Sequence, residues 1–242
     1  MATVIIGTSG FGGAIARRLT ALGRPVYLLS RDAARLSALA SELRCGSSAV
    51  DVRDSAALAS ALASASSSLP RISGLVYAVG SLPLAPLRRT SAEDVAEAFA
   101  VNCLGAIMAV KALAPALAAG DTPGSIVLFS TVAASQGFPN HAAIAAAKGG
   151  VEAFTRSAAA ELAPRVRVNA IAPSLSDTPL AAKLLASDAT RKALGEAHPL
   201  PRLGSAEDAA AAALFLLSHE QSGWVTGQVL AVDGGRSTVR TR

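Results

Sequence analysis

Aromatic residues and cysteines are scarce in this chain. Only 4% of its 242 residues are Phe, Trp or Tyr, and the two cysteines are Cys45 and Cys103. The cysteines lie far apart, with no spacing typical of metal ligands, so we predict no metal site and no disulfide framework. With so few aromatic rings, the core has to be built from Ala, Leu, Val and Ile.

Concentrated charge and long apolar runs are also missing. Charged residues make up 16% of the chain, the net charge is +5, and the arginines are scattered except in the tail "GRSTVRTR". Nucleic-acid binding favours a basic stripe with interleaved aromatic residues, so we predict no nucleic-acid partner. No apolar stretch reaches about 18 residues without polar, Gly or Pro breaks, which argues against a membrane partner.

The chain begins with a strand-like run at Thr3, which leaves no room for a signal or transit peptide. Together with the absence of a membrane span, this predicts a soluble, cytoplasmic protein. A mature organelle protein that had lost its presequence would give the same pattern.

What the sequence does contain is an alternation of short β-rich runs and long Ala-rich helical patterns. We expect strands over 3–7, 26–29, 48–52, 74–79, 125–130, 165–173 and 227–235, and helices over 11–22, 32–43, 55–66, 91–104, 105–119 and 142–162. The strands are almost wholly apolar, as strands covered on both faces are. The prediction is an α/β fold, a doubly wound, seven-stranded parallel sheet of Rossmann type, in a single domain over 1–242.

The first strand is followed by a glycine-rich turn, "GTSGFGG", at residues 7–13. Glycines at a first strand-to-helix junction let the backbone approach a pyrophosphate, whose charge suits the helix N-terminus, although such a turn can also serve packing alone. The candidate cofactor-binding residues here are Gly7, Thr8, Ser9, Gly10, Phe11 and Gly12.

After the second strand comes "SRD", at residues 30–32. Folds that bind NAD place an acidic residue near this strand end to hold the ribose hydroxyls. Here Ser30 stands at that place and Arg31 follows, which can pair with a 2′-phosphate. We therefore predict NADP as the cofactor; the alternative is an ordinary surface arginine, with Asp32 capping the next helix.

These features and several later ones resemble the short-chain dehydrogenase/reductase family over essentially the whole chain. Asp51 and Val52 match the strand end that flanks adenine in that family, and "RVNAIAPS" with Pro173, followed by Thr178, resembles the strand and loop that meet the nicotinamide. "WVTGQVLAVDGG" resembles the C-terminal strand that commonly lies at a subunit interface. The resemblance implies a small-molecule substrate and a homo-oligomer, a tetramer.

The glycine motifs depart from the family pattern in two places. If Gly10 and Gly12 hold the last two glycine places of the first motif, its first two places fall on Ile5 and Ile6; alternatively, Gly7 is the first glycine and the loop is one residue shorter. The family's Asn-Asn-Ala-Gly after the fourth strand reads "YAVG" at 77–80. Both asparagines are gone, while Ala78 and Gly80 still permit a close backbone approach to a cofactor.

The catalytic positions are mostly retained, but the tyrosine is not. The resemblance assigns the lysine place to Lys148, the asparagine place to Asn102 in "VNCLG", and the serine place to Thr131, or to the adjacent Ser130 if the register is shifted by one. The tyrosine place, one helical turn before Lys148, is Ile144. The only tyrosines of the chain, Tyr27 and Tyr77, lie in predicted strands, so no shift of register restores the usual general acid.

Three interpretations remain open. His141, seven residues before Lys148, shares its helical stripe if the helix begins that early, and its position matches the tyrosine of the related enoyl reductases, so it is a candidate proton donor. Alternatively, water held by Asn102 and Thr131 supplies the proton, or the substrate needs none. The third interpretation is a non-catalytic dinucleotide-binding protein that acts as a sensor, scaffold or subunit partner.

The family's mobile substrate loop corresponds to residues 174–201. Leu180, Leu184 and Leu185 suggest an apolar lid there, with ordinary amphipathic packing as the alternative. We expect the two remaining histidines, His198 and His219, to be structural or exposed.

Overall fold

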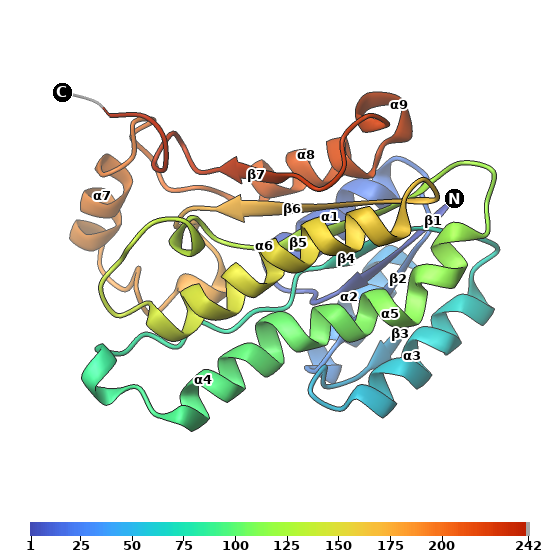
Figure 1. The fold of residues 1–242 in the computed structure, drawn as a ribbon, viewed down its shortest axis with the longest axis horizontal. Helices are drawn as coiled ribbons and strands as arrows, with labels where there is room; N and C mark the ends of the chain where they lie inside the picture. The colour runs from blue at the N-terminus through green and yellow to red at the C-terminus, as the bar shows by residue number, and fades with distance from the viewer. Residues whose placement is uncertain (241–242) are drawn as a thin grey trace.

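The computed structural model describes residues 1–240. Its centre is a seven-stranded parallel sheet in the order β3-β2-β1-β4-β5-β6-β7 (Figure 1). The strands are β1 Ala2–Ile6, β2 Val26–Ser30, β3 Gly46–Ala49, β4 Ile72–Tyr77, β5 Gly124–Phe129, β6 Val166–Pro173 and β7 Val229–Val232. The predicted α/β fold with seven parallel strands is confirmed.

Helices cover both faces of the sheet. One face carries α1 Phe11–Ala21, α2 Ala33–Leu43 and α8 Ala206–Leu217; the other carries α3 Ser55–Ser68, α4 Ala92–Phe99, α5 Gly105–Ala118 and α6 Ala142–Leu162. The smaller helices are the π-helical turn Ala100–Leu104, the 3-10 turns Leu87–Arg89, Val132–Ala134 and Pro179–Ala181, α7 Asp188–Glu196 and α9 His219–Ser222.

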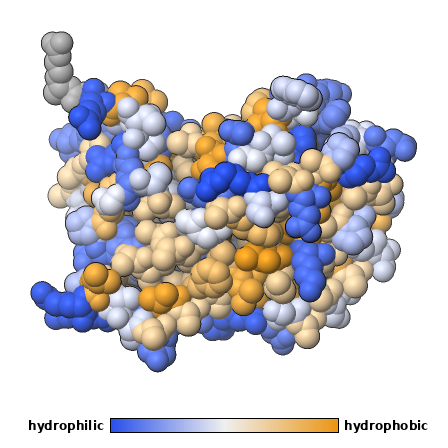
Figure 2. Space-filling view, in the orientation of Figure 1, coloured by the Kyte–Doolittle hydropathy of each residue, from blue (hydrophilic) through white to orange (hydrophobic). Residues whose placement is uncertain are grey.

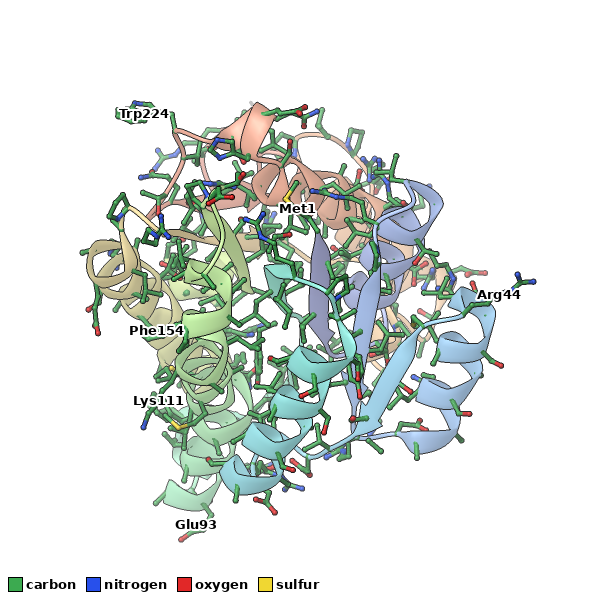
Figure 3. The ribbon with its side chains drawn as sticks, turned by 90° about the vertical axis from the view of Figure 1, so that its right-hand side faces the viewer. Met1, Arg44, Glu93, Lys111, Phe154 and Trp224 are labelled. Atoms are coloured by element: carbon green, nitrogen blue, oxygen red, sulfur yellow. The ribbon has the colours of Figure 1, made fainter. Side chains whose placement is uncertain are left out.

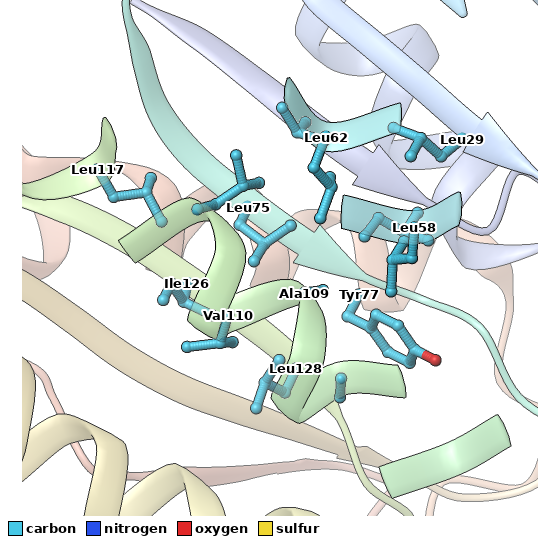
Figure 4. Packing of buried hydrophobic residues seen from close by; sticks show 14 of the residues in the cluster. Leu29, Leu58, Leu62, Leu75, Tyr77, Ala109, Val110, Leu117, Ile126 and Leu128 are labelled. Carbon is cyan, nitrogen blue, oxygen red and sulfur yellow. The ribbon is translucent and has the colours of Figure 1, made fainter. Parts of the chain in front are cut away.

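The core consists of aliphatic side chains on each side of the sheet, as the scarcity of aromatic residues predicts. On the α3–α5 side, one buried cluster includes Leu58 and Leu62 of α3, Leu75 of β4, Val110 of α5 and Leu128 of β5 (Figure 4). Alanines such as Ala109 let α5 lie close to the sheet. Burial of this apolar surface is the main force that holds the layers together.

The observed elements differ from the predicted ones most in two strands and one helix, and no helix was predicted where α8 lies. The third strand covers 46–49 instead of 48–52, because its pairing with β2 ends at the contact of Ser30 with Ala49. The seventh strand covers 229–232 instead of 227–235, since Gly227, Gly234 and Gly235 all have positive φ and form turns. The helix predicted over 91–104 is split, because a π-helical turn follows α4.

The helical stretch from α4 to the end of α5 is, by length and composition, apolar enough to cross a bilayer. Half of its most apolar window is buried within the fold, and it contacts α3, α6 and β4. A core helix of an α/β protein has the same composition, so its packing accounts for it.

The chain order creates a switch point at the centre of the sheet. From β1 the chain moves outward to β2 and β3, and it then returns to β4 on the other side of β1. Ligands of doubly wound sheets bind in the crevice beyond the carboxyl ends of the strands at such a point. Most of the predicted site residues lie at or just after the carboxyl ends of β1 to β6, so they meet at this edge.

Candidate functional site

The glycine-rich turn after β1 forms a tight backbone cradle. Gly7 and Gly10 have φ of 92° and 56°, and a Cβ on Gly12 would lie 1.7 Å from the Gly7 carbonyl oxygen. Ile5 and Ile6 are buried in β1, so Gly7 is the first glycine of this turn. The Thr8 hydroxyl is buried and has no hydrogen-bond partner among residues 1–240. The cradle thus offers a polar atom and the N-terminus of α1 to a ligand.

The ends of β2 and β3 bring an acidic and two basic side chains together. Arg31, whose side chain is 74% exposed, lies 4.0 Å from the Asp51 carboxylate, and Arg53 donates to that carboxylate at 2.6 Å. These hydrogen bonds from Arg53 lower the pKa of Asp51 to about 2. Sequence reasoning missed Arg53, although it stands two residues after Asp51. Asp51 and Val52 lie in the turn after β3, not in the strand as predicted.

Lys148 lies in the buried part of α6. Its Nζ donates a hydrogen bond to the Phe129 carbonyl oxygen at 2.7 Å, at the end of β5. Burial lowers its pKa from 10.5 to about 8, because the interior disfavours the charged form. Its ammonium is also near the turn after β4, since a Cβ on Gly80 would lie 3.9 Å from Nζ.

Asn102 is fully buried within the π-helical turn. Its Nδ2 donates to the Ala98 carbonyl oxygen and to the Ser81 hydroxyl, both at 2.9 Å, and its Oδ1 accepts from the Ser81 backbone N–H at 3.2 Å. These bonds fix the amide's orientation at the cavity wall. They also connect α4 to the loop after β4, where Gly80 lies.

The missing asparagines of "YAVG" are replaced by a different brace. Tyr77 is buried at the end of β4, and its hydroxyl donates to the Val101 carbonyl oxygen at 2.7 Å. Only glycine at 105 leaves room for this hydroxyl, since a Cβ there would lie 2.3 Å from it. Tyr77 therefore holds the π-helical turn that carries Asn102, and it takes no part in the cavity.

The position one turn before Lys148 is apolar in the structure too. Ile144 is 3% exposed and lines the same cavity as Lys148. Across from it, Thr131 lines the cavity, and its Oγ1 only accepts a weak bond from the Ala133 N–H at 3.3 Å, which leaves its hydroxyl hydrogen free. The neighbouring Ser130 hydroxyl donates to Glu152 at 2.7 Å.

His141 also lines the cavity, but it lies outside the helix. Helix α6 begins at Ala142, so His141 precedes its first residue instead of lying on its stripe. The His141 Nδ1 is 2.7 Å from the Pro139 carbonyl oxygen, and its ring lies 5.6 Å from that of Phe138. Because a carbonyl oxygen only accepts, Nδ1 carries a hydrogen and Nε2 is the atom left for exchange with a ligand.

A cavity of about 390 Å³ brings most of these groups together. Of the predicted residues, its lining includes Phe11, Ala78, Gly80, Asn102, Thr131, His141, Lys148, Pro173 and Thr178. The others lie beyond this lining, toward the ends of β1 to β3: Gly7, Thr8, Ser9, Gly10, Gly12, Ser30, Arg31, Asp51 and Val52. Leu180 and Leu184 line the cavity and Leu185 is buried, so the apolar lid stays a prediction.

Sequence reasoning missed one pair of residues in this cavity. Ser174 Oγ lies 2.8 Å from His198 Nε2, and both side chains line the cavity. His198 is buried, whereas His219 is exposed at the start of α9. The residues are separated by 24 positions, and only the path of the chain from β6 through α7 brings them together.

A parallel doubly wound sheet with a glycine cradle at its first turn defines a dinucleotide-binding fold. A family model described as enoyl-(acyl carrier protein) reductase matches residues 5–237. The chain is 36% identical over 232 residues to a protein of Xanthobacter autotrophicus named inactive 2-(S)-hydroxypropyl-CoM dehydrogenase 2; the match covers 93% of this chain and 100% of the relative.

Solved structures agree. A short-chain type dehydrogenase/reductase from Mycobacterium ulcerans superimposes with a TM-score of 0.92 at 30% identity, covering 99% of this chain and 90% of that one. The 3-ketoacyl-(acyl-carrier-protein) reductase from Brucella melitensis complexed with NADH gives 0.90 at 30% identity, covering 98% of each chain. The chain belongs to the short-chain dehydrogenase/reductase family, whose members bind a nicotinamide dinucleotide.

Proposed function

We propose that the protein is an NADP(H)-dependent oxidoreductase that reduces a small carbonyl, enone or imine substrate with a proton donor other than tyrosine. The observation that carries this proposal is the joint placement of Lys148, Asn102 and Thr131 in one cavity beside the glycine cradle. A protein that served only as a scaffold has no evident use for all three.

The cofactor fits the residues present. The cradle, where the Thr8 hydroxyl has no partner within residues 1–240, would receive the pyrophosphate, and Ser30 with the exposed Arg31 would receive a 2′-phosphate. Arg53 is committed to Asp51, so Arg31 is the guanidinium left for this role. Lys148 would hold the nicotinamide ribose. A bound dinucleotide supplies the hydride.

The remaining chemistry belongs to the chain. Thr131 donates its free hydroxyl hydrogen to the substrate oxygen and orients it. As an imidazolium, with a hydrogen on each ring nitrogen, His141 gives the Nε2 proton to that oxygen and becomes the neutral ring whose Nδ1–H stays bonded to the Pro139 carbonyl. Ile144 supplies no proton and keeps its own wall of the cavity apolar. Water held by Asn102 and Thr131 is the other source of the proton.

Titration of NADPH into the purified protein, followed by nicotinamide fluorescence, tests the first half of the proposal. We expect saturable binding; without it, the proposed function is wrong. NADPH oxidation is then measured against ketones, enones and imines. The His141→Gln variant should lose most of any activity found, by about 10²- to 10⁴-fold, if His141 is the donor. Retained activity in this variant assigns the proton to water.

A second candidate function is a non-catalytic dinucleotide-binding protein. The observation that favours it is the buried isoleucine at the tyrosine place, in a chain that is similar to a protein named inactive. Saturable NADPH binding without turnover on any of the three substrate classes would support this function over the first.

A further inference from the structure

We propose that Ser174 and His198 form a hydrogen-bond acceptor site for a substrate hydroxyl, so that the preferred substrate is a hydroxyketone. This inference rests on the proposed function, because it names the substrate class for the same cavity.

The pair is held firmly at the cavity wall. Ser174 directly follows β6, and His198 comes two residues after the end of α7 and is 6% exposed. The turn at Gly234 packs against the other side of the histidine, since a Cβ there would lie 3.5 Å from the His198 Cβ. A second cavity, of about 340 Å³, lies on the far side of the pair and shares Ser174 and His198 with the first.

The hydrogen bonds of the two side chains determine which atom of the pair donates and which accepts. The His198 Nδ1 is 2.9 Å from the Leu194 carbonyl oxygen and 3.3 Å from that of Gly195. A carbonyl oxygen only accepts, so Nδ1 carries the hydrogen of the neutral ring and Nε2 presents a lone pair. The Ser174 hydroxyl therefore donates to Nε2 over 2.8 Å. Its only hydrogen is then used, and its oxygen is left as an acceptor.

A ligand group that meets this oxygen has to bring a donor. A hydroxyl does so. A carbonyl oxygen would force the serine to turn its hydrogen away from Nε2, which would leave a buried lone pair of His198 unpaired, and buried unpaired polar groups are costly. The site therefore discriminates between a hydroxyl and a carbonyl, and it also disfavours an apolar group at this place.

Ser174 lies beside the reacting end of the cavity. Strands β5 and β6 are neighbours, with Phe129 paired to Ile171 and the Ser130 N–H bonded to the Ile171 carbonyl oxygen. Thr131 and Ser174 follow these adjacent strand ends, and neighbouring strands run about 4.8 Å apart. Thr131 donates a hydrogen bond and Ser174 accepts one. A substrate that places a carbonyl oxygen at Thr131 and a hydroxyl at Ser174 satisfies both residues.

Three cyclic probes test the polarity by steady-state kinetics with NADPH: 2-hydroxycyclohexanone, cyclohexanone and cyclohexane-1,2-dione. The measured quantity is the ratio of kcat/KM for the hydroxyketone to that for the ketone, and comparison between variants cancels the intrinsic reactivities of the probes. We expect Ser174→Ala to lower this ratio by about 5- to 10-fold, the loss of one hydrogen bond. Ser174→Thr, which keeps the hydroxyl, should retain it.

Two further variants sharpen the test. His198→Phe frees the Ser174 hydrogen, so the preference should move from the hydroxyketone toward the dione. Ser135→Ala is the matched control, since Ser135 donates to the Val132 carbonyl oxygen and does not line the cavity; its ratio should equal that of the wild type. The proposal would be overturned by an unchanged kcat/KM ratio in Ser174→Ala. It would also be overturned if the wild type preferred the dione and His198→Phe had the same preference.

A binding measurement keeps this test separate from the proposed function. NMR titration of the cofactor-free protein with cyclohexane-1,2-diol and cyclohexanol gives two dissociation constants without any turnover. The diol should bind about 5- to 10-fold more tightly than cyclohexanol in the wild type, and equally in Ser174→Ala. If the wild type binds the diol more tightly but reduces no ketone, only the reductase function is refuted. If the wild type binds the diol and cyclohexanol equally, the hydroxyl site is refuted.

Discussion

The side chain at position 144 decides which proton chemistry this cavity can support. Ile144 is buried, lines the cavity and lies one helical turn before Lys148, on the same face of α6. Lys148 still has its bond to the Phe129 carbonyl oxygen, and Thr131 still has a free hydroxyl hydrogen. The arrangement that remains binds and orients a substrate oxygen without the usual acid.

Restoring that acid gives a first prediction. Ile144→Tyr should raise carbonyl reduction, by up to the 10²-fold at the lower end of what general acid catalysis contributes. Ile144→Phe is the control, because it adds the ring without the hydroxyl and imposes the same overpacking. Steady-state NADPH oxidation with a simple ketone measures both. Equal rates in the two variants would show that position 144 does not face the reacting oxygen.

Lys148 gives a prediction for stability as a function of pH. Its pKa is about 8 in the fold and 10.5 in the unfolded chain, so between these values the unfolded state binds more protons and stability rises with pH. Relative to Lys148→Met, the wild type should gain about 2–3 kcal/mol between pH 7 and pH 10.

Urea unfolding of both proteins at the two pH values measures this gain. Lys111→Met, at an exposed position of α5, should show no such change relative to the wild type. A wild type that loses stability relative to Lys148→Met as the pH rises would contradict the burial argument.

Arg31 determines cofactor choice under the proposed function. Removal of its guanidinium in Arg31→Ala should weaken NADPH binding about 10-fold, the cost of a charge-assisted hydrogen bond, and leave NADH binding nearly unchanged. Fluorescence titrations with both cofactors measure this. Arg24→Ala is the matched control, since Arg24 precedes β2 and lies at the opposite end of that strand. Equal losses for both cofactors would argue against a 2′-phosphate site.

At the scale of the element, the most informative feature is the π-helical turn between α4 and α5. Extra residues in a helical turn leave backbone carbonyls without their usual partners, and such turns are frequent at functional sites. Here Asn102 pairs with the Ala98 carbonyl and Tyr77 with that of Val101. The turn is therefore held from β4 as well as from its own helix.

A double-mutant cycle tests this brace. Tyr77→Phe removes the hydroxyl that donates to the buried Val101 carbonyl oxygen, and this loss should lower the free energy of unfolding by about 1–3 kcal/mol. Gly105→Ala should also destabilise, because its Cβ would meet the tyrosine hydroxyl, and the cost should shrink in the Tyr77→Phe background. Urea unfolding gives the coupling energy; strictly additive costs would show that the two residues do not interact.

The alternation of apolar runs and helical patterns was sufficient to predict the seven strands and the helices up to α6, because a sheet covered on both faces needs apolar strands and amphipathic helices. It did not predict α8, although that helix covers one face of the sheet. Strand ends were less predictable, as β3 and β7 show, since pairing and positive-φ glycines determine them. Residues linked by family resemblance, such as Lys148 and Thr131, met in one cavity. The Ser174–His198 pair could not be foreseen, because its contact depends on how a 24-residue excursion folds back.

At the scale of the whole molecule, apolar side chains remain exposed in two separate places. Val95, Phe99 and Leu104 on α4 and the turn after it are 40–42% exposed, on a face where apolar colour extends across α4, α5 and α6 (Figure 2). Far from it, Trp224 is 100% exposed and projects from the molecular surface (Figure 3), and Leu230 of β7 is 38% exposed. Large exposed apolar side chains in clusters mark interaction sites.

Two self-complementary faces on one chain generate a closed tetramer, because each face supplies one two-fold interface. We therefore predict a homotetramer, with a mass four times the 24.2 kDa of the chain in light scattering after size exclusion.

Phe99→Glu should remove one interface and Trp224→Glu the other, since burying an unpaired charge is costly. Each single variant should therefore give a dimer, and the double variant should give a monomer. Leu22→Glu, at an exposed position just after α1, is the control and should stay tetrameric. A monomeric wild type would refute the prediction, and a wild-type mass retained in both single variants would place the interfaces elsewhere.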